Sequence, residues 1–175
     1  MRKMDTHEIV NKVASSSLIA VNLENYYPKG ERIIFDLKDH LFQGLILKEK
    51  DFREFVNNHN WNQYEGKYLA IHCTTDAVIP TWAYMLLASK LTPIAAEVFF
   101  GDLKSLDCHL IKTAIDNINI EQFKNAKIVV KGCGSLPITE FAYVELTKKL
   151  LPVVSSIMFG EPCSTVPIYK RPRES

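Results

Sequence analysis

Three of the four cysteines in this 175-residue chain, Cys73, Cys133 and Cys163, stand where a protein of alternating strands and helices binds its ligands. Each of them follows a predicted strand, and open parallel sheets bind ligands beyond the carboxyl ends of their strands. Neighbouring strands lie about 5 Å apart, so loops from one sheet edge can bring together thiols that are distant in sequence. Cys108 falls inside a predicted helix, and we interpret it as a packing residue.

Three thiols gathered in this way would bind a metal ion. Thiolates are preferred ligands of Zn²⁺, iron and iron–sulfur clusters, and a bound metal keeps them deprotonated. Gly132 and Gly134 flank Cys133, which leaves the backbone free to turn and its amides able to point at a thiolate. Asp76, three residues after Cys73, is the first candidate for a fourth protein ligand, with an exogenous ligand as the alternative. The predicted metal ligands are therefore Cys73, Cys133, Cys163 and Asp76.

Three other interpretations of the cysteines stay open, because the chain has no CxxC or CxxH pair. Free cysteines are often buried in protein cores, so all of them could be packing residues. Cys133 or Cys73, each just before a predicted helix, could instead be the nucleophile of a thiol enzyme or persulfide carrier, its pKa lowered by the helix N-terminus. Such a thiol needs a base, for which His72 and His109 are available. The third alternative is a non-catalytic interaction protein whose apolar helices form a homodimer.

Two further motifs carry less chemical information. Gly132-x-Gly134 follows a predicted strand, but it lacks the third glycine of a dinucleotide-binding fingerprint, so we reject that function. The stretch from Asp36 to His40 holds a pair of carboxylates and a histidine that could form a polar site. Stretches of this kind are more often solvated turns, and we interpret it as one.

The elements that must position these residues follow from hydrophobic periodicity and turn residues. The predicted strands cover 18–23, 32–37, 68–71, 94–100, 127–130 and 153–159, with a short edge strand at 165–169 interrupted by Pro167. The predicted helices cover 48–59, 82–90, 106–118 and 138–151, with a further short helix ending near residue 14. This order predicts an α/β fold with a mainly parallel sheet flanked by helices. We expect one domain over 1–175, in which 1–66 is a less regular N-terminal extension and 67–175 consists of repeated strand–helix units.

Two of these strand–helix units resemble each other. In each, a strand is followed by a cysteine, by a loop that contains proline, and by a helix that opens with an aromatic residue, alanine and tyrosine. The helix openings are Trp82-Ala83-Tyr84 and Phe141-Ala142-Tyr143. The pattern places Cys73 and Cys133 at the same position of their units.

Composition excludes several classes of protein. The chain has 21 Lys and Arg against 20 Asp and Glu, a net charge of +1, which gives no basic face for nucleic acid. No apolar run approaches the roughly 20 residues that span a bilayer, and the first residues show no secretory signal. We therefore expect a cytoplasmic protein that binds neither nucleic acid nor membrane, with reduced cysteines.

Several segments of the chain resemble a known family. They cover residues 36–38, 45–53, 76–84, 131–133 and 160–170, and the last, GEPCSTVPIYK, is the most specific. Together they resemble an uncharacterised family of bacterial proteins, a domain of unknown function, that is often encoded near genes of the sulfur-mobilisation route of iron–sulfur cluster assembly. The resemblance implies no established activity. It does imply metal or cluster handling accessory to iron–sulfur metabolism, with iron–sulfur assembly proteins as partners and zinc, iron or a cluster as cofactor.

Overall fold

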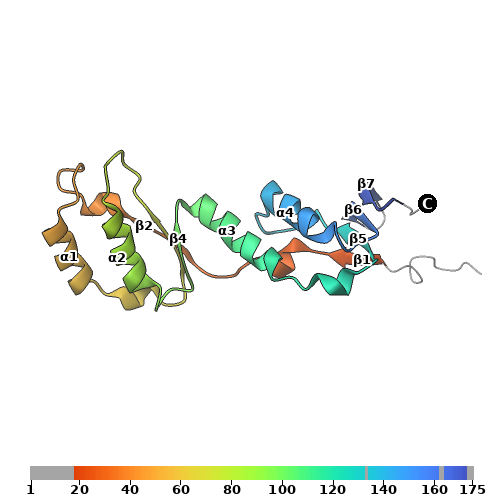
Figure 1. The fold of residues 1–175 in the computed structure, drawn as a ribbon, viewed down its shortest axis with the longest axis horizontal. Coiled ribbons are helices and arrows are strands. Elements are labelled where there is room, and N and C mark those ends of the chain that lie inside the picture. The colour runs from red at the N-terminus through yellow and green to blue at the C-terminus, as the bar shows by residue number, and fades with distance from the viewer. Residues whose placement is uncertain (1–17, 133, 162–163, 173–175) are drawn as a thin grey trace, which may run out of the picture. The chain divides into compact units, whose positions relative to one another are not determined.

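A computed structural model describes residues 18–132, 134–161 and 164–172 of the chain (Figure 1). The predicted N-terminal helix, Cys133 and Cys163 lie outside these described residues. The chain divides into two compact units. We call Pro28–Thr113 the inserted unit, because it separates the two parts of the other, the terminal unit, which combines Met1–Tyr27 with Ala114–Ser175.

The inserted unit is built on a parallel sheet of three strands. They are β2 (Arg32–Asp36), β3 (Tyr68–His72) and β4 (Glu97–Phe100), in the order β2-β3-β4. Helices α1 (Glu49–Asn58) and α2 (Thr81–Leu91) pack against Leu69 and Ile71 of the central strand, while Ala70 on the other face contacts Leu106 and Leu110 of α3 (Leu103–Asp116). A continuous apolar run is what a central parallel strand needs, because both of its faces are covered.

The terminal unit has a mixed sheet of four strands. They are β1 (Leu18–Val21), β5 (Lys127–Val130), β6 (Ser156–Glu161) and β7 (Ser164–Lys170), in the order β1-β5-β6-β7. The first three are parallel, and β7 runs antiparallel to β6 at the end of the sheet. Helix α4 (Glu140–Leu150) buries Ala142, Leu146 and Leu150. The predicted edge strand that contains Pro167 is confirmed in β7, where an edge position tolerates the missing amide.

The mixed α/β class and the predominance of parallel strands are confirmed, but the strands form two sheets instead of one. The four helices predicted between residues 48 and 151 all form, within a few residues of their expected ends. The predicted boundary at residue 66 falls inside the inserted unit, just before β3. A sequence pattern identifies a strand but does not show which strands it pairs with. The patterns therefore could not show that the strands form two sheets.

The two units repeat one structural pattern. In the inserted unit the Tyr84 and Phe100 rings meet edge to face with centroids 5.2 Å apart, and in the terminal unit Tyr143 and Phe159 do so at 5.6 Å. Both pairs are related by the same shift of 59 positions. The same shift relates the left-handed residue Gly66, with φ 67°, to Asn125, with φ 57°.

Backbone hydrogen bonds extend this correspondence. The Gly66 amide donates to the carbonyl of Ile94 at 3.1 Å, and its counterpart Asn125 donates to Val153 at 2.8 Å. Residues 60–101 thus correspond to 119–160 without insertion or deletion. In this correspondence the counterpart of Cys73 is Gly132. The expectation that Cys73 and Cys133 occupy equivalent positions is therefore wrong by one residue.

Strands β1 and β2 also correspond, here with a shift of 14 positions. Each leads into a 3-10 helix, Leu23–Tyr26 after β1 and Leu37–His40 after β2. The cap residue of each, Asn22 and Asp36, accepts a hydrogen bond from the backbone amide two residues later. The repeat therefore includes the residues at the carboxyl ends of the first strands, where ligands of α/β proteins bind.

Candidate functional sites

A polar crevice lies at the carboxyl edge of the sheet in the terminal unit. It encloses about 70 Å³ and is lined by side chains or backbone of Asn22, Glu24, Lys131, Gly132, Gly134, Leu136, Ile138 and Tyr143. The Glu24 carboxylate accepts hydrogen bonds from the Leu136 amide at 2.7 Å and the Ser135 hydroxyl at 3.3 Å. The bond from the Leu136 amide, with smaller contributions from Ser135 and Asn22, lowers the pKa of Glu24 although partial desolvation opposes it. The crevice therefore holds a fixed negative charge at neutral pH.

Gly132 and Gly134 lie close to other side chains at this edge. A Cβ atom added to Gly132 would overlap the ring of Phe159, and one added to Gly134 would overlap the carboxylate of Glu24. We expected glycine here for its freedom to turn. The structure gives a different reason at Gly132, whose backbone closely approaches the Phe159 ring, whereas at Gly134 the neighbouring group is the end of the Glu24 side chain.

The structure brings together the strands that precede two of the three predicted metal-binding cysteines. Strands β5 and β6 are parallel neighbours, with Val130 paired to Phe159, and the chain continues from their ends towards Cys133 and Cys163. Cys73 follows β3, which belongs to the sheet of the inserted unit. The expected single sheet edge shared by all three is therefore wrong, and the cluster of three thiols stays a prediction.

Cys73 lies half-buried against the core of the inserted unit. Its thiol donates to the carbonyl oxygen of Thr75 at 3.6 Å. Burial, and then the proximity of Cys73, raises the pKa of Tyr84. Asp76 is exposed in the loop between β3 and α2. Over the described residues, no group of three or more His, Cys, Asp or Glu side chains is arranged to hold a metal ion.

A second polar pocket, in the inserted unit, contains the stretch that we interpreted as a solvated turn. Asp36, Asp39 and His40 line it, together with His59 from the end of α1 and Tyr64 from the 3-10 helix Trp61–Tyr64. Ile34, Phe35 and Phe55 complete its walls, and it encloses about 210 Å³. The turn itself forms, but it faces a pocket on one side, which the local sequence could not show.

The two histidines of this pocket sit among aromatic rings. The His40 ring lies 4.0 Å from that of Phe55 and 5.4 Å from that of Phe35, measured between centroids. The Nε2 atom of His59 accepts from the Gln63 amide nitrogen at 2.9 Å and lies 3.2 Å from the Tyr64 hydroxyl. An amide nitrogen can only donate, so this contact fits a neutral His59 ring whose Nε2 is unprotonated.

Burial sets the protonation states in this pocket. It lowers the pKa of His59 and of His40, and in His40 it outweighs the opposing effect of the Asp39 charge. Burial alone would raise the pKa of Asp36, but hydrogen bonds from the Thr74 hydroxyl and from the amides of Lys38 and Thr74 lower it to about 2. At neutral pH the pocket thus combines uncharged imidazoles with carboxylates.

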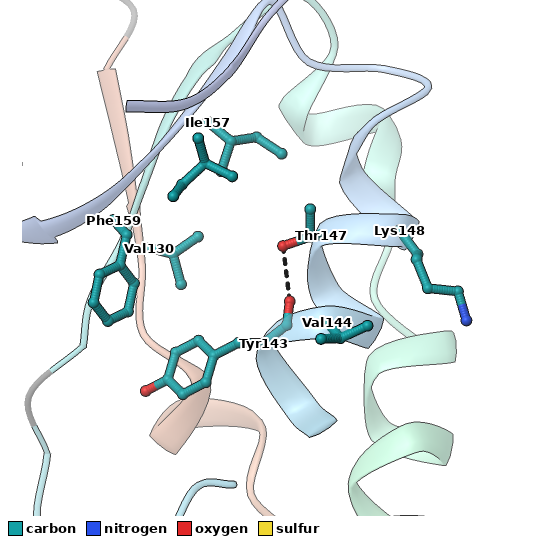
Figure 2. A pocket seen from close by; sticks show the side chains of 8 residues that line it. Val130, Tyr143, Val144, Thr147, Lys148, Ile157 and Phe159 are labelled. Carbon is teal, nitrogen blue, oxygen red and sulfur yellow. Dashed lines mark hydrogen bonds between the residues drawn. The ribbon is translucent and has the colours of Figure 1, made fainter. Parts of the chain in front are cut away.

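The largest of these pockets is apolar and lies in the terminal unit between α4 and the sheet. It encloses about 290 Å³, and Figure 2 shows Val130, Ile157 and Phe159 on the strands facing Tyr143, Val144 and Thr147 on the helix. The Thr147 hydroxyl already donates to the Tyr143 carbonyl at 2.8 Å, and the Lys148 amine pairs with Glu145 at 2.6 Å. These polar groups at the pocket are therefore already engaged within α4.

Sequence reasoning missed Glu24, His59 and Tyr64 as site residues. Each shares its pocket with residues that are distant in sequence, such as Gly132 for Glu24 and Asp36 for His59 and Tyr64, and none belongs to a motif. The internal repeat is the signal that could have indicated Glu24. Glu24 stands two residues after the cap of its 3-10 helix, and Lys38 occupies the corresponding position in the other unit.

None of the helices described by the structure is both long and apolar enough to cross a membrane. Comparison with known proteins identifies the class of the chain. Residues 7–171 match the family described as "Protein of unknown function (DUF2480)", and the chain belongs to that family. Neither the curated proteins nor the solved structures with which it was compared contain a match.

Proposed function

We propose that the protein binds a thiophilic metal ion, zinc or iron, at the carboxyl edge of the terminal unit's sheet, with Cys133 and Cys163 as its ligands. The observation that carries this proposal is the parallel pairing of β5 with β6, which starts the two cysteine-bearing segments from adjacent points of one sheet edge. Two thiolates at one edge form the beginning of a zinc or iron site, because soft metal ions prefer sulfur ligands.

The charge of the crevice supports a cation over a free nucleophilic thiolate. Gly132 and Gly134, which flank Cys133 in sequence, both line the crevice that holds the anionic Glu24. A carboxylate near a thiol disfavours the free thiolate, whereas a divalent metal ion is stabilised by both groups. Glu24 is thus an additional candidate ligand within the terminal unit. Asp76, by contrast, lies in the inserted unit.

The wider role that we propose is accessory to iron–sulfur metabolism, with iron–sulfur assembly proteins as partners. It rests on the cysteine pattern and on the family resemblance of the sequence. A thiol enzyme or persulfide carrier that uses one nucleophilic cysteine is the alternative. It predicts one thiol that is alkylated much faster than the others at neutral pH, because its pKa lies below the usual value of about 8.5.

Elemental analysis of the full chain purified without oxygen tests the metal site. We expect about one equivalent of zinc or iron, reduced at least about tenfold by Cys133→Ser and by Cys163→Ser. Cys108→Ser is the matched control and should leave the metal content unchanged. Cys73→Ser then distinguishes a site that includes this residue from one built in the terminal unit alone. Less than about a tenth of an equivalent, unchanged by Cys133→Ser, would overturn the proposal.

A further inference from the structure

The histidine pocket lies within the inserted unit, and none of its residues is among the proposed metal ligands. It is formed by the carboxyl end of β2, the following 3-10 helix Leu37–His40, the end of α1 and Tyr64. Five of the eight residues that line it are ionisable: Asp36, Asp39, His40, His59 and Tyr64. So many titratable groups facing one cavity are unusual for a packing surface and typical of ligand sites.

The repeat within the chain shows what packing alone requires at these positions. In the terminal unit, the counterparts of Asp36, Asp39 and His40 are the uncharged Asn22, Asn25 and Tyr26. Tyr64 corresponds to Phe123, and the same shift of 59 positions carries His59, just before the repeated segment, to Ile118; these two residues are only 4% and 6% exposed. The same fold therefore forms with uncharged side chains at these positions. Packing alone does not require the carboxylates and imidazoles of the inserted unit.

The charges in the pocket favour a positive ligand. The residues that line it include two carboxylates and no lysine or arginine. The nearby Lys38 amine is paired with Asp36 at 3.2 Å. Phe55 and Tyr64 add partly exposed aromatic rings, and the faces of such rings attract cations, whereas Phe35 is buried and stacked on His40 and Trp61. The neutral state of both imidazoles leaves the carboxylates and ring faces without a competing positive charge.

We propose that this pocket binds a small organic cation, an alkylammonium or quaternary ammonium group, against its aromatic rings and the Asp39 carboxylate. Rings combined with carboxylates are the surroundings in which proteins recognise such groups. The volume of about 210 Å³ limits the bound part to a few heavy atoms, since drug-sized ligands need roughly 300 Å³ or more. Asp39 is the charged partner, because it is exposed while Asp36 is held by Thr74 and Lys38.

Fluorescence of Trp61 provides a direct measurement. The Trp61 ring lies 6.0 Å from that of Phe35, which lines the pocket, and the chain has only one other tryptophan, Trp82. The full chain with Trp82→Phe is titrated with choline and with propylammonium. Each cation is compared with an uncharged analogue of similar size, 3,3-dimethylbutan-1-ol for choline and butan-1-ol for propylammonium. We expect at least one cation to bind at least about tenfold more tightly than its analogue.

Substitutions taken from the terminal unit test the site without disturbing the fold. Asp39→Asn copies Asn25 and His59→Ile copies Ile118, and each should weaken binding of the cation about fivefold or more. Asp76→Asn removes an exposed carboxylate of the same unit outside the pocket and should leave binding unchanged. Circular dichroism confirms that each variant is folded.

The proposal is overturned if neither cation binds more tightly than its uncharged analogue. It is equally overturned if Asp76→Asn weakens binding as much as Asp39→Asn does, since the effect would then be one of general charge. These measurements do not involve the cysteines. Failure of the metal proposal would therefore not affect the cation proposal, and failure of the cation proposal would not affect the metal proposal.

Discussion

The Asp36 carboxylate accepts two hydrogen bonds from Thr74, one from its backbone amide at 3.1 Å and one from its hydroxyl at 2.5 Å. Asp36 ends β2 and Thr74 follows β3, so a single side chain fixes the loop that leaves the neighbouring strand. In the terminal unit Glu24 does the same for the loop after β5 through the Leu136 amide. Both units thus use a carboxylate to hold the carboxyl edge of the sheet in place.

Asp36→Ala should destabilise the inserted unit by about 2 kcal/mol, because it removes the cap of the 3-10 helix and the bonds to Thr74 together. Urea denaturation followed by tryptophan fluorescence measures the change. Asp39→Asn, in the same 3-10 helix but exposed, is the control and should shift the free energy of unfolding by less than about 0.5 kcal/mol. An equal effect of both substitutions would show that the Thr74 bonds contribute nothing specific.

Protonation of the histidine pocket should make the protein less stable in mild acid. Burial holds the pKa of His40 and of His59 below the ordinary value of 6.5. The unfolded chain therefore binds more protons, and stability that is fully present above pH 6.5 is lost as the pH falls through the lowered values. Asp36 adds a second loss, which begins near its ordinary pKa of 3.8 and continues towards its value of about 2.

The double variant His40→Tyr, His59→Ile tests this pH dependence, because it copies the residues of the terminal unit. We expect the free energy of unfolding of the variant to be flat from pH 7 down to about pH 5, where that of the unaltered protein declines. Urea denaturation at a series of pH values gives both curves. Parallel curves would contradict the assignment of the decline to these two histidines.

The local elements could be predicted because their patterns are local. Helix α1 buries Phe52 and Val56 and half-buries Phe55, as the helical spacing of these residues indicates. The apolar run of Leu69, Ala70 and Ile71 marks a strand covered on both faces. Periodicity, caps and turn residues act within a few positions of the chain, and the sequence displays them directly.

The sites could not be predicted to the same degree, because their residues meet only through sheet order. The interpretation that placed Cys73 with Cys133 assumed that β3 and β5 share a sheet, and they do not. Likewise, nothing near His59 in the sequence shows that it faces the same pocket as Asp39. The internal repeat indicates which positions of the two units correspond. Only a structure shows which strands pair.

Gly160→Ala should be far more damaging than Gly44→Ala, although both glycines have positive φ. At Gly160, with φ 126°, a Cβ atom would also lie 2.5 Å from the carbonyl oxygen of Ser164, whereas at Gly44, with φ 71°, no atom lies within 4 Å. We expect a loss of about 3 kcal/mol or more for Gly160→Ala and about 1 kcal/mol for Gly44→Ala. Thermal unfolding by circular dichroism measures both, and comparable losses would contradict the importance of this close approach.

Helix α3 should make the two units unfold together. Its residues Leu106 and Leu110 pack in the inserted unit, while Ile115, which is 1% exposed, belongs to the terminal unit. Loss of structure in one half of a continuous helix removes the hydrogen bonds that span the junction, and this destabilises the other half. On this basis we predict that the two units unfold in one transition.

The positions of the tryptophans make this coupling measurable. Trp61 and Trp82, the two tryptophans of the chain, both lie in the inserted unit, so their fluorescence reports on that unit alone. Leu146→Ala creates a cavity in the terminal unit, and Leu87→Ala creates the corresponding cavity in the inserted unit; each should cost about 2–5 kcal/mol. If the units are coupled, Leu146→Ala shifts the fluorescence transition in urea to lower concentration about as far as Leu87→Ala does. A fluorescence transition that Leu146→Ala leaves in place, while circular dichroism shows an earlier loss of helix, would mean that the units unfold independently.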